Sequence, residues 1–245
     1  MFDVLTTMAP RNRTGPLSHY FNSSDYQIEV GIDEAGKGPM FGRVYTGATI
    51  LPKDDTFPHE LMKDSKRFTS TVALNNACEN VKQNAIAWSV TYEEPSSIDK
   101  INIREATFKA MHRAIKEVIT QIMPTGIPPE DDELMLLVDG NDFKPLNLFT
   151  ESNGITIVPH VCIEGGDNKY TSIAASSILA KVARDAYIFD MVDKYPLLDD
   201  YYSLSSNKGY GTKAHMDGIQ KYGTSPWHRK SYGLCKSVIS CPDFK

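Results

Sequence analysis

The most informative stretch of the chain reads Val30-Gly31-Ile32-Asp33-Glu34-Ala35-Gly36-Lys37-Gly38-Pro39. Apolar residues lead into two adjacent acids, and glycines follow them. Because neighbouring side chains of a strand point to opposite faces, Asp33 and Glu34 can converge only where the strand ends. The glycines let the backbone approach a ligand closely. The stretch therefore predicts a strand that ends in metal-binding acids, with a substrate-contacting loop behind it.

Length and composition limit the class of protein. The 245 residues are 41% hydrophobic, enough for one large domain with a small appendage. No run approaches the roughly 18 to 20 apolar residues of a membrane helix, so we expect no membrane association. The four cysteines form no CxxC pair, which favours reduced thiols and an intracellular, cytoplasmic location.

The charge is unevenly distributed. The whole chain carries a net charge of -5, which taken alone argues against a nucleic-acid binder. From residue 203 onward, however, seven Lys or Arg stand against two acids. This C-terminal excess of positive charge predicts a surface for a polyanion.

Periodicity predicts alternating strands and helices, and so an α/β domain. We expect strands at 26–32, 44–51, 85–92, 134–138 and 155–163, and helices at about 70–82, 98–122, 171–194 and 213–221. The early hairpin makes the sheet mixed. The expected organisation is a flexible N-terminal tail (1–25), a catalytic domain (26–200) and a helical, basic, substrate-binding extension (201–245).

Four acids stand next to predicted element ends. Asp33 and Glu34 follow the first expected strand, and Asp139 follows the apolar strand expected at 134–138. Asp167 precedes the helix expected at 171–194. Each one alone could be an ordinary turn or cap residue. Together they suit hard divalent cations, because clustered carboxylates repel unless a cation neutralises them. Two such ions can clamp the attacking and leaving oxygens of an in-line phosphoryl displacement. The His and Cys spacing that is typical of zinc sites is absent from the sequence.

Further motifs lie along the chain after the opening stretch, and two of them contain Asp139 and Asp167. They are Asp64-Ser65-Lys66-Arg67, the stretch 98–103, Val138-Asp139-Gly140-Asn141, Gly166-Asp167 with 172–185, and 208–212 with His215 and 226–232. With the opening stretch, this set resembles the type 2 ribonucleases H, the family of bacterial ribonuclease HII and the eukaryotic catalytic subunit. The resemblance covers residues 26 to 233.

The resemblance implies a ribonuclease H-like fold, with a five-stranded mixed sheet flanked by helices and a helical C-terminal extension. It implies hydrolysis of RNA in RNA–DNA hybrids and incision 5′ to single ribonucleotides embedded in duplex DNA, with Mg²⁺ or Mn²⁺ in a two-metal site. The implied metal-binding and catalytic residues are Asp33, Glu34, Asp139 and Asp167. Gly36, Lys37 and Gly38 correspond to the ribose-sensing loop, and Tyr210 to the tyrosine that packs on the sugar.

Other residues are candidates on weaker grounds. Lys181 and Arg184 share a helix face with Ser177 and could hold substrate phosphates, as could Lys66, although a solvated charged face is an equal alternative. Lys37 stands where the family usually has Arg, and so lacks the bidentate fork. His215 and His228 could be ligands or structural residues.

Alternatives remain open for function and assembly. A catalytically weak or partner-dependent hybrid-binding subunit is disfavoured by the complete set of four acids. Another two-metal phosphodiesterase is disfavoured by Gly36-Lys37-Gly38 and Tyr210. We expect a monomer that acts alone, with accessory subunits as the alternative.

Overall fold

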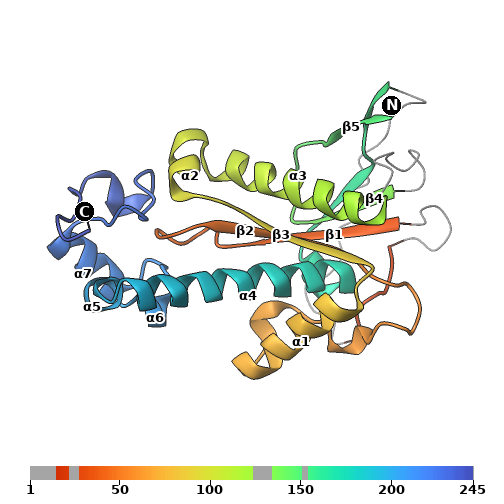
Figure 1. The fold of residues 1–245 in the computed structure, drawn as a ribbon, viewed down its shortest axis with the longest axis horizontal. Coiled ribbons are helices and arrows are strands. Elements are labelled where there is room, and N and C mark those ends of the chain that lie inside the picture. Colours follow the sequence, from red (N-terminus) through yellow and green to blue (C-terminus); the bar gives the residue numbers. More distant parts are fainter. Residues whose placement is uncertain (1–14, 22–27, 124–133, 151–153, 245) are drawn as a thin grey trace.

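The computed structural model describes residues 15–21, 28–123, 134–150 and 154–244. At its centre lies a five-stranded sheet in the order β3-β2-β1-β4-β7 (Figure 1). The middle strand β1 (Ile28–Ala35) is antiparallel to β2 (Val44–Ile50) and parallel to β4 (Leu134–Asp139). On the two outer sides, β3 (Ala87–Glu93) is antiparallel to β2 and β7 (His160–Ile163) is parallel to β4. The expected five-stranded mixed sheet is confirmed.

Helices cover both faces of this sheet (Figure 1). The helix α3 (Ile103–Ile122) packs on one face and α4 (Thr171–Lys194) on the other, with α1 (Thr71–Asn84) beside α4. The C-terminal extension adds three short helices, α5 (Leu197–Tyr202), α6 (Leu204–Asn207) and α7 (Lys213–Tyr222). No helix in the described ranges is long and apolar enough to cross a membrane.

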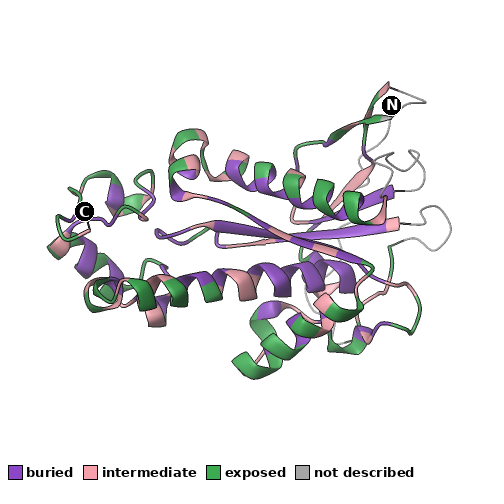
Figure 2. Ribbon diagram, viewed as in Figure 1, coloured by how far each residue is buried: buried purple, intermediate pink, exposed green. Residues whose placement is uncertain are grey.

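Alternation along β1 gives the two faces of the sheet different partners. Val30 and Ile32 are fully buried in a core that includes Phe108, Met111 and Ile115 of α3. The strands β1, β2 and β4 are buried along most of their length, while the outer sides of α1 and α3 are exposed (Figure 2). This arrangement is that of a buried sheet between two helical layers.

The other face of β1 and β2 is shaped for a close approach of α4. A Cβ at Gly31 would lie 2.2 Å from the carbonyl carbon of Ser172, and a Cβ at Gly47 would lie 2.3 Å from the carbonyl oxygen of Ser176. Only glycine fits at such distances. Ser176 Oγ donates to the Gly31 carbonyl at 2.8 Å, and Thr49 Oγ1 donates to the Ser172 carbonyl at 2.7 Å. Helix α4 is therefore held at a fixed depth on the sheet.

The strand expected at 155–163 is two strands. The first is β6 (Gly154–Ile157), which forms a separate hairpin with β5 (Asn147–Thr150), and the second is β7. Between them, Val158 donates its N–H to the Leu146 carbonyl, and Pro159 has no N–H to continue a ladder. The prediction of a continuous strand is wrong because the apolar pattern did not register this change of sheet.

The helix expected at 98–122 is also interrupted. It divides into α2 (Pro95–Ile101) and α3 at Asn102, whose φ is 70°. With a ψ of 165° this is a strained conformation outside the αL region, and the Asn102 side-chain oxygen stabilises it locally by accepting the Glu105 N–H at 3.0 Å as the cap of α3. The break therefore has a local physical cause.

The domain boundaries differ in part from expectation. The boundary expected after residue 200 falls inside α5. Residues 15–21, which we assigned to a flexible tail, contact the start of α4: Ser18 donates to the Lys169 carbonyl and accepts the Thr171 N–H. Residues 1–14 and 22–25 of that tail lie outside the described residues.

We expect Gly31→Ala to destabilise the protein by about 3 kcal/mol, because overpacking of a tight contact typically costs 1–3 kcal/mol and here the obstacle is helix backbone. In a domain of this size the melting temperature should fall by roughly 6–12 °C. Thermal unfolding followed by circular dichroism measures this change. Gly15→Ala is the matched control, because a Cβ at Gly15 meets nothing within 4 Å. Equal melting temperatures for the two variants would contradict the packing argument.

Candidate functional site

Two of the expected acids lie at the ends of neighbouring parallel strands. Ile32 of β1 pairs with Val138 of β4, so Asp33 and Asp139 follow at the same level. Asp33 faces α4, because Gly31, two positions earlier, packs against that helix. Both carboxylates are thus brought to one edge of the sheet, and Asp33 is only 4% exposed.

A short turn before α4 adds the third acid. The 3₁₀ turn Gly166–Asn168 leads directly toward the helix. The Gly166 N–H donates to Asp139 Oδ1 at 2.7 Å, and the backbone of Asp167 also acts to lower the pKa of this carboxyl. The turn therefore holds Asp139 with its backbone and places the Asp167 carboxylate beside it.

Glu34 is arranged differently from the expectation. The strand continues to Ala35, so the prediction that it ends before the acid pair is wrong, and alternation sends Glu34 to the other face from Asp33. Glu34 Oε1 pairs with Lys37 Nζ at 2.7 Å. Glu34 Oε2 is buried and has no hydrogen-bond partner among the described residues. A buried carboxylate oxygen without a partner, next to other carboxylates, is one that a cation would satisfy.

Burial raises the pKa of all four carboxyls, and the charges of neighbouring carboxylates raise it further for Asp33, Glu34 and Asp167. Burial is the largest cause in each case. The charges of Glu34 and Asp139 raise the pKa of Asp33 further, and those of Asp139 and Asp64 help to raise the pKa of Asp167 to about 6. Such a donor set fits divalent cations with a preference for oxygen ligands. Across the described ranges, no three His, Cys, Asp or Glu side chains are gathered tightly enough to hold an ion as they stand.

The segment Asp64-Ser65-Lys66 brings a positive charge to these acids. Burial lowers the pKa of Lys66, but the charges of Asp64, Asp167, Asp33 and Asp139 outweigh it and raise the pKa. Asp64 caps the 3₁₀ turn Ser65–Arg67 by accepting the Lys66 N–H at 2.8 Å. Lys66 therefore lies among the acids, where a substrate phosphate would need a cation.

The glycine loop, which we define as residues 36–43 between β1 and β2, lies against Tyr210. A Cβ at Gly38 would be 3.6 Å from Tyr210 Cε1, and the Met40 N–H donates to the Gly209 carbonyl at 2.8 Å. Gly36 has a φ of 94°, which favours glycine. Tyr210 is 51% exposed, so its ring is available beside the loop. The structure thus brings together the two elements expected to contact a ribose.

Lys181 and Arg184 have different surroundings. Lys181 is partly exposed and pairs with Asp185 at 2.8 Å, the expected i,i+4 partner. Arg184 is buried under the glycine loop, where its Nη2 donates to the Lys208 carbonyl at 2.9 Å. A Cβ at Gly36 would lie 2.2 Å from Arg184 Nε. Arg184 therefore packs against the side of the glycine loop that faces α4.

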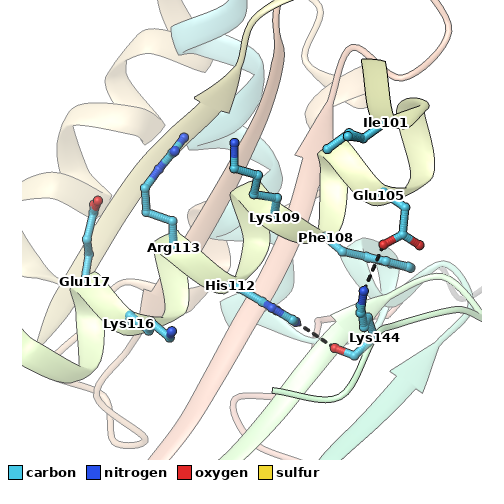
Figure 3. A pocket seen from close by; sticks show the side chains of 9 residues that line it. All are labelled: Ile101, Glu105, Phe108, Lys109, His112, Arg113, Lys116, Glu117 and Lys144. Atoms are coloured by element: carbon cyan, nitrogen blue, oxygen red, sulfur yellow. Dashed lines mark hydrogen bonds and ion pairs between the residues drawn. The ribbon is translucent and has the colours of Figure 1, made fainter. Parts of the chain in front are cut away.

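A separate pocket lies over α3, on the other side of the sheet from α4 (Figure 3). None of the four acids lines it. Its basic side chains are largely occupied: Lys144 pairs with Glu105 at 3.0 Å, and Lys109 and Arg113 pair with Glu93. We therefore do not assign the functional site to this pocket.

Comparisons with known proteins identify the family. The family model of ribonuclease HII matches residues 30–235. The chain belongs to the ribonuclease HII family. Ribonuclease HII of Bacteroides thetaiotaomicron is 42% identical over 209 residues, covering 84% of this chain and 90% of the relative. Ribonuclease HII of Phocaeicola vulgatus is 43% identical with the same coverage. This family supports assignment as a type 2 ribonuclease H, a hydrolase of the nuclease class, as the motifs predicted.

Solved structures confirm the ribonuclease H-like fold. Ribonuclease H2 from Pyrococcus horikoshii superposes with a TM-score of 0.64 at 20% identity, covering 85% of this chain and 95% of that one. Bst-RNase HIII, solved in complex with Mn²⁺, superposes with a TM-score of 0.53 at 18% identity, covering 88% and 66%.

The structure gives two residues supporting roles that the sequence did not indicate. Ser177, expected on a face that could hold phosphates, lies 3.1 Å, Oγ to Oγ, from Ser65, and its hydroxyl acts to lower the pKa of Asp33, so it connects two motifs that are distant in sequence. Arg229 was counted as surface charge, but it is fully buried. Its position within the motif 226–232 was the available signal, although no local pattern indicated burial.

We expect Asp167→Asn to stabilise the protein without metal and to weaken its response to metal. A raised pKa means that the folded state disfavours the ionised carboxylate, so removing this charge at neutral pH should add about 1 kcal/mol after solvent screening. The melting temperature in EDTA should rise by roughly 2–4 °C, while Mg²⁺ or Mn²⁺ should stabilise the variant less than the parent protein.

Asp142→Asn serves as the control for this experiment. The bonds from Arg104 lower the pKa of Asp142, so its charge favours the fold and its neutralisation should give no increase in melting temperature. A lower melting temperature for Asp167→Asn in EDTA would contradict the repulsion argument.

Proposed function

We propose that this protein is an endonuclease that hydrolyses RNA in RNA–DNA hybrids and incises 5′ to single ribonucleotides embedded in duplex DNA, leaving 3′-hydroxyl and 5′-phosphate ends. One observation carries the proposal: the strand that presents Asp33 to Asp139 continues into the glycine loop, which lies against Tyr210. A hydrolytic centre and a surface suited to a sugar are therefore adjacent along the same piece of chain.

Asp33, Glu34, Asp139 and Asp167 would hold the metal ions. Two Mg²⁺ or Mn²⁺ ions would supply an activated water and neutralise charge on the phosphate during an in-line displacement. The Mn²⁺ complex of Bst-RNase HIII supports this choice of ion class. Among the protein groups, Lys66 would attract the phosphate, and the backbone of the turn at Gly166 would keep Asp139 oriented.

Recognition of the ribose would fall to the glycine loop and Tyr210. The 2′-hydroxyl distinguishes RNA from DNA and both donates and accepts hydrogen bonds, so backbone groups of Gly36, Lys37 and Gly38 suit it. Such contacts read no base edges, so cleavage should be independent of sequence. The Tyr210 ring would pack on the adjoining sugar. Lys181 would contact phosphates from α4, and Arg184 would act on the substrate through the loop above it.

We further propose that the protein acts inside the cell as a monomer. The alternative is a catalytically weak or partner-dependent hybrid-binding subunit. A ribonuclease HII from Archaeoglobus fulgidus, 22% identical to this chain, was solved in a complex with PCNA, so relatives of this fold do form assemblies. Activity of the purified protein on its own distinguishes the two possibilities.

The decisive test is Asp139→Asn on a labelled DNA duplex that contains one ribonucleotide. The parent protein with Mg²⁺ or Mn²⁺ should cut 5′ to the ribonucleotide and should also cut an RNA–DNA hybrid. The variant should lose more than about 100-fold in rate, because even the outer partners of metal ligands contribute 10- to 100-fold. Product mapping on denaturing gels gives the cut position.

An all-DNA duplex is the substrate control for this test. Cutting of the all-DNA duplex at a comparable rate would reject ribonucleotide specificity. An unaltered rate for Asp139→Asn would reject the assigned catalytic centre, and hybrid binding without cutting would favour the binding-subunit alternative.

Lys37→Arg should change cutting of the single-ribonucleotide duplex by less than about threefold. The Lys37 carbonyl is held by Arg229 and Tyr232, so sensing through the backbone would survive a change of side chain. Steady-state kinetics on the single-ribonucleotide duplex and the hybrid measure this change. A large gain confined to the single-ribonucleotide duplex would instead mean that the side chain grips the junction phosphate, where Arg has a bidentate fork.

A further inference from the structure

Arg229 is fully buried, and every hydrogen bond that its guanidinium donates goes to the glycine loop. A guanidinium has five N–H donors. All five are used by backbone carbonyls of the loop, at 2.6–3.0 Å: Nε by Gly42, Nη1 by Lys37 and Pro39, and Nη2 by Gly36 and Arg43. Loop residues on both sides of Gly38 are therefore fixed to one planar group.

The chemistry of this contact requires arginine. Burial lowers the pKa of Arg229 to about 10, which still leaves the group protonated at neutral pH. A buried cation must find polar partners to replace water, and here carbonyl dipoles supply them. Lysine carries three donors on one nitrogen and cannot reach five carbonyls spread over a plane.

The neighbouring residue His228 connects the same segment to Tyr210. The Ser225 N–H donates to His228 Nδ1 at 3.0 Å, so that nitrogen carries no proton. His228 Nε2–H then donates to His215 Nε2 at 3.0 Å, which leaves the His215 proton on Nδ1, where it donates to the Tyr210 carbonyl at 2.9 Å. Both rings are buried and their pKa values are lowered by burial, which keeps them neutral as this chain of bonds requires.

The segment Ser225–Tyr232, which we name the clamp segment, is itself anchored to the catalytic domain. Asp99 of α2 accepts the N–H groups of Lys230 and Ser231 at 2.9 and 2.8 Å. Tyr232 Oη donates to the Lys37 carbonyl at 2.8 Å. The clamp segment thus joins α2, the glycine loop and, through His215, Tyr210.

We propose that the clamp segment sets the distance between the glycine loop and Tyr210, with Arg229, His228 and His215 as positioning residues, and so determines how strongly a lone ribonucleotide is preferred over DNA. This inference rests on the proposed function. Gly38 lies between the held carbonyls of Lys37 and Pro39 and faces Tyr210. A ribose between them is recognised only if both sides keep their places, because small misplacements remote from the reacting atoms can cost about 100-fold.

Arg229→Lys tests the loop side of the clamp segment. Binding to a duplex with one ribonucleotide and to an all-DNA duplex of the same sequence is measured by fluorescence anisotropy in EDTA, without turnover. The preference for the ribonucleotide should fall about tenfold, while all-DNA binding stays within about twofold. The value of kcat/KM on the single-ribonucleotide duplex should fall about 10- to 100-fold. The decrease should be smaller on an RNA–DNA hybrid, because any of many riboses can bind at the loop.

Two further variants keep the test decisive. Arg104→Lys makes the same chemical change at an exposed ion pair with Asp142 and should leave the preference unaltered. His215→Gln removes the bond to the Tyr210 carbonyl but leaves every contact of Arg229, so it should also reduce the preference, and it carries the test if Arg229→Lys does not fold. Folded Arg229→Lys and His215→Gln variants that keep the full preference would overturn the proposal.

Failure of the proposed function gives a different result. In that case the parent protein itself would show no preference for the ribonucleotide. Hydrogen exchange then tests the clamp segment directly: amides of residues 36–43 should exchange at least tenfold faster in Arg229→Lys than in Arg104→Lys. Equal exchange in the two variants would reject the positioning role, whatever the substrate.

Discussion

The close approach of α4 to the sheet at Gly31 and Gly47 is the constraint on which the rest of the structure depends. Two missing side chains allow helix backbone to contact strand backbone, and the hydroxyls of Thr49 and Ser176 satisfy the polar groups at that contact. The depth of the helix fixes the turn before it, so Asp167 reaches Asp139. The same helix carries Ser177 to Asp33 and Arg184 to the underside of the glycine loop.

The electrostatics of the site run against stability of the metal-free protein. Four carboxyls have raised pKa values because burial disfavours their ionisation, and for Asp33, Glu34 and Asp167 the charges of neighbouring carboxylates add to this effect. Lys66 and Lys37 relieve only part of this repulsion. A site of this kind exchanges folding free energy for affinity toward cations, which is a common relation between stability and activity. The positive charges of Lys66 and Lys37 beside the acids would also help a protein of net negative charge to bind a polyanion.

The sequence predicted the parts of the molecule that local pattern controls. The bounds of α4, β2 and β4 follow closely from apolar periodicity, whereas β1 runs past its expected end, and the positions of Asp139 and Asp167 follow from the ends of β4 and α4. The break between β6 and β7 escaped prediction because it depends on a bond from Val158 to Leu146, a tertiary contact. The burial of Arg229 was not predicted for the same reason, because its partners lie about 190 positions earlier in the chain. An arginine in a basic stretch of sequence is typical of an exposed surface.

This long separation in sequence has a consequence for biosynthesis. A ribosome delivers the chain from its N-terminus, and domains generally fold as their residues emerge. All four acids precede residue 168, so the proposed hydrolytic centre has its ligands before the C-terminal extension exists. The glycine loop has no Arg229 to organise its carbonyls until residue 229 of 245 has been made. On the roles proposed above, a nascent or C-terminally shortened chain would hold the four acids of the hydrolytic centre without the contacts that position the glycine loop for discrimination.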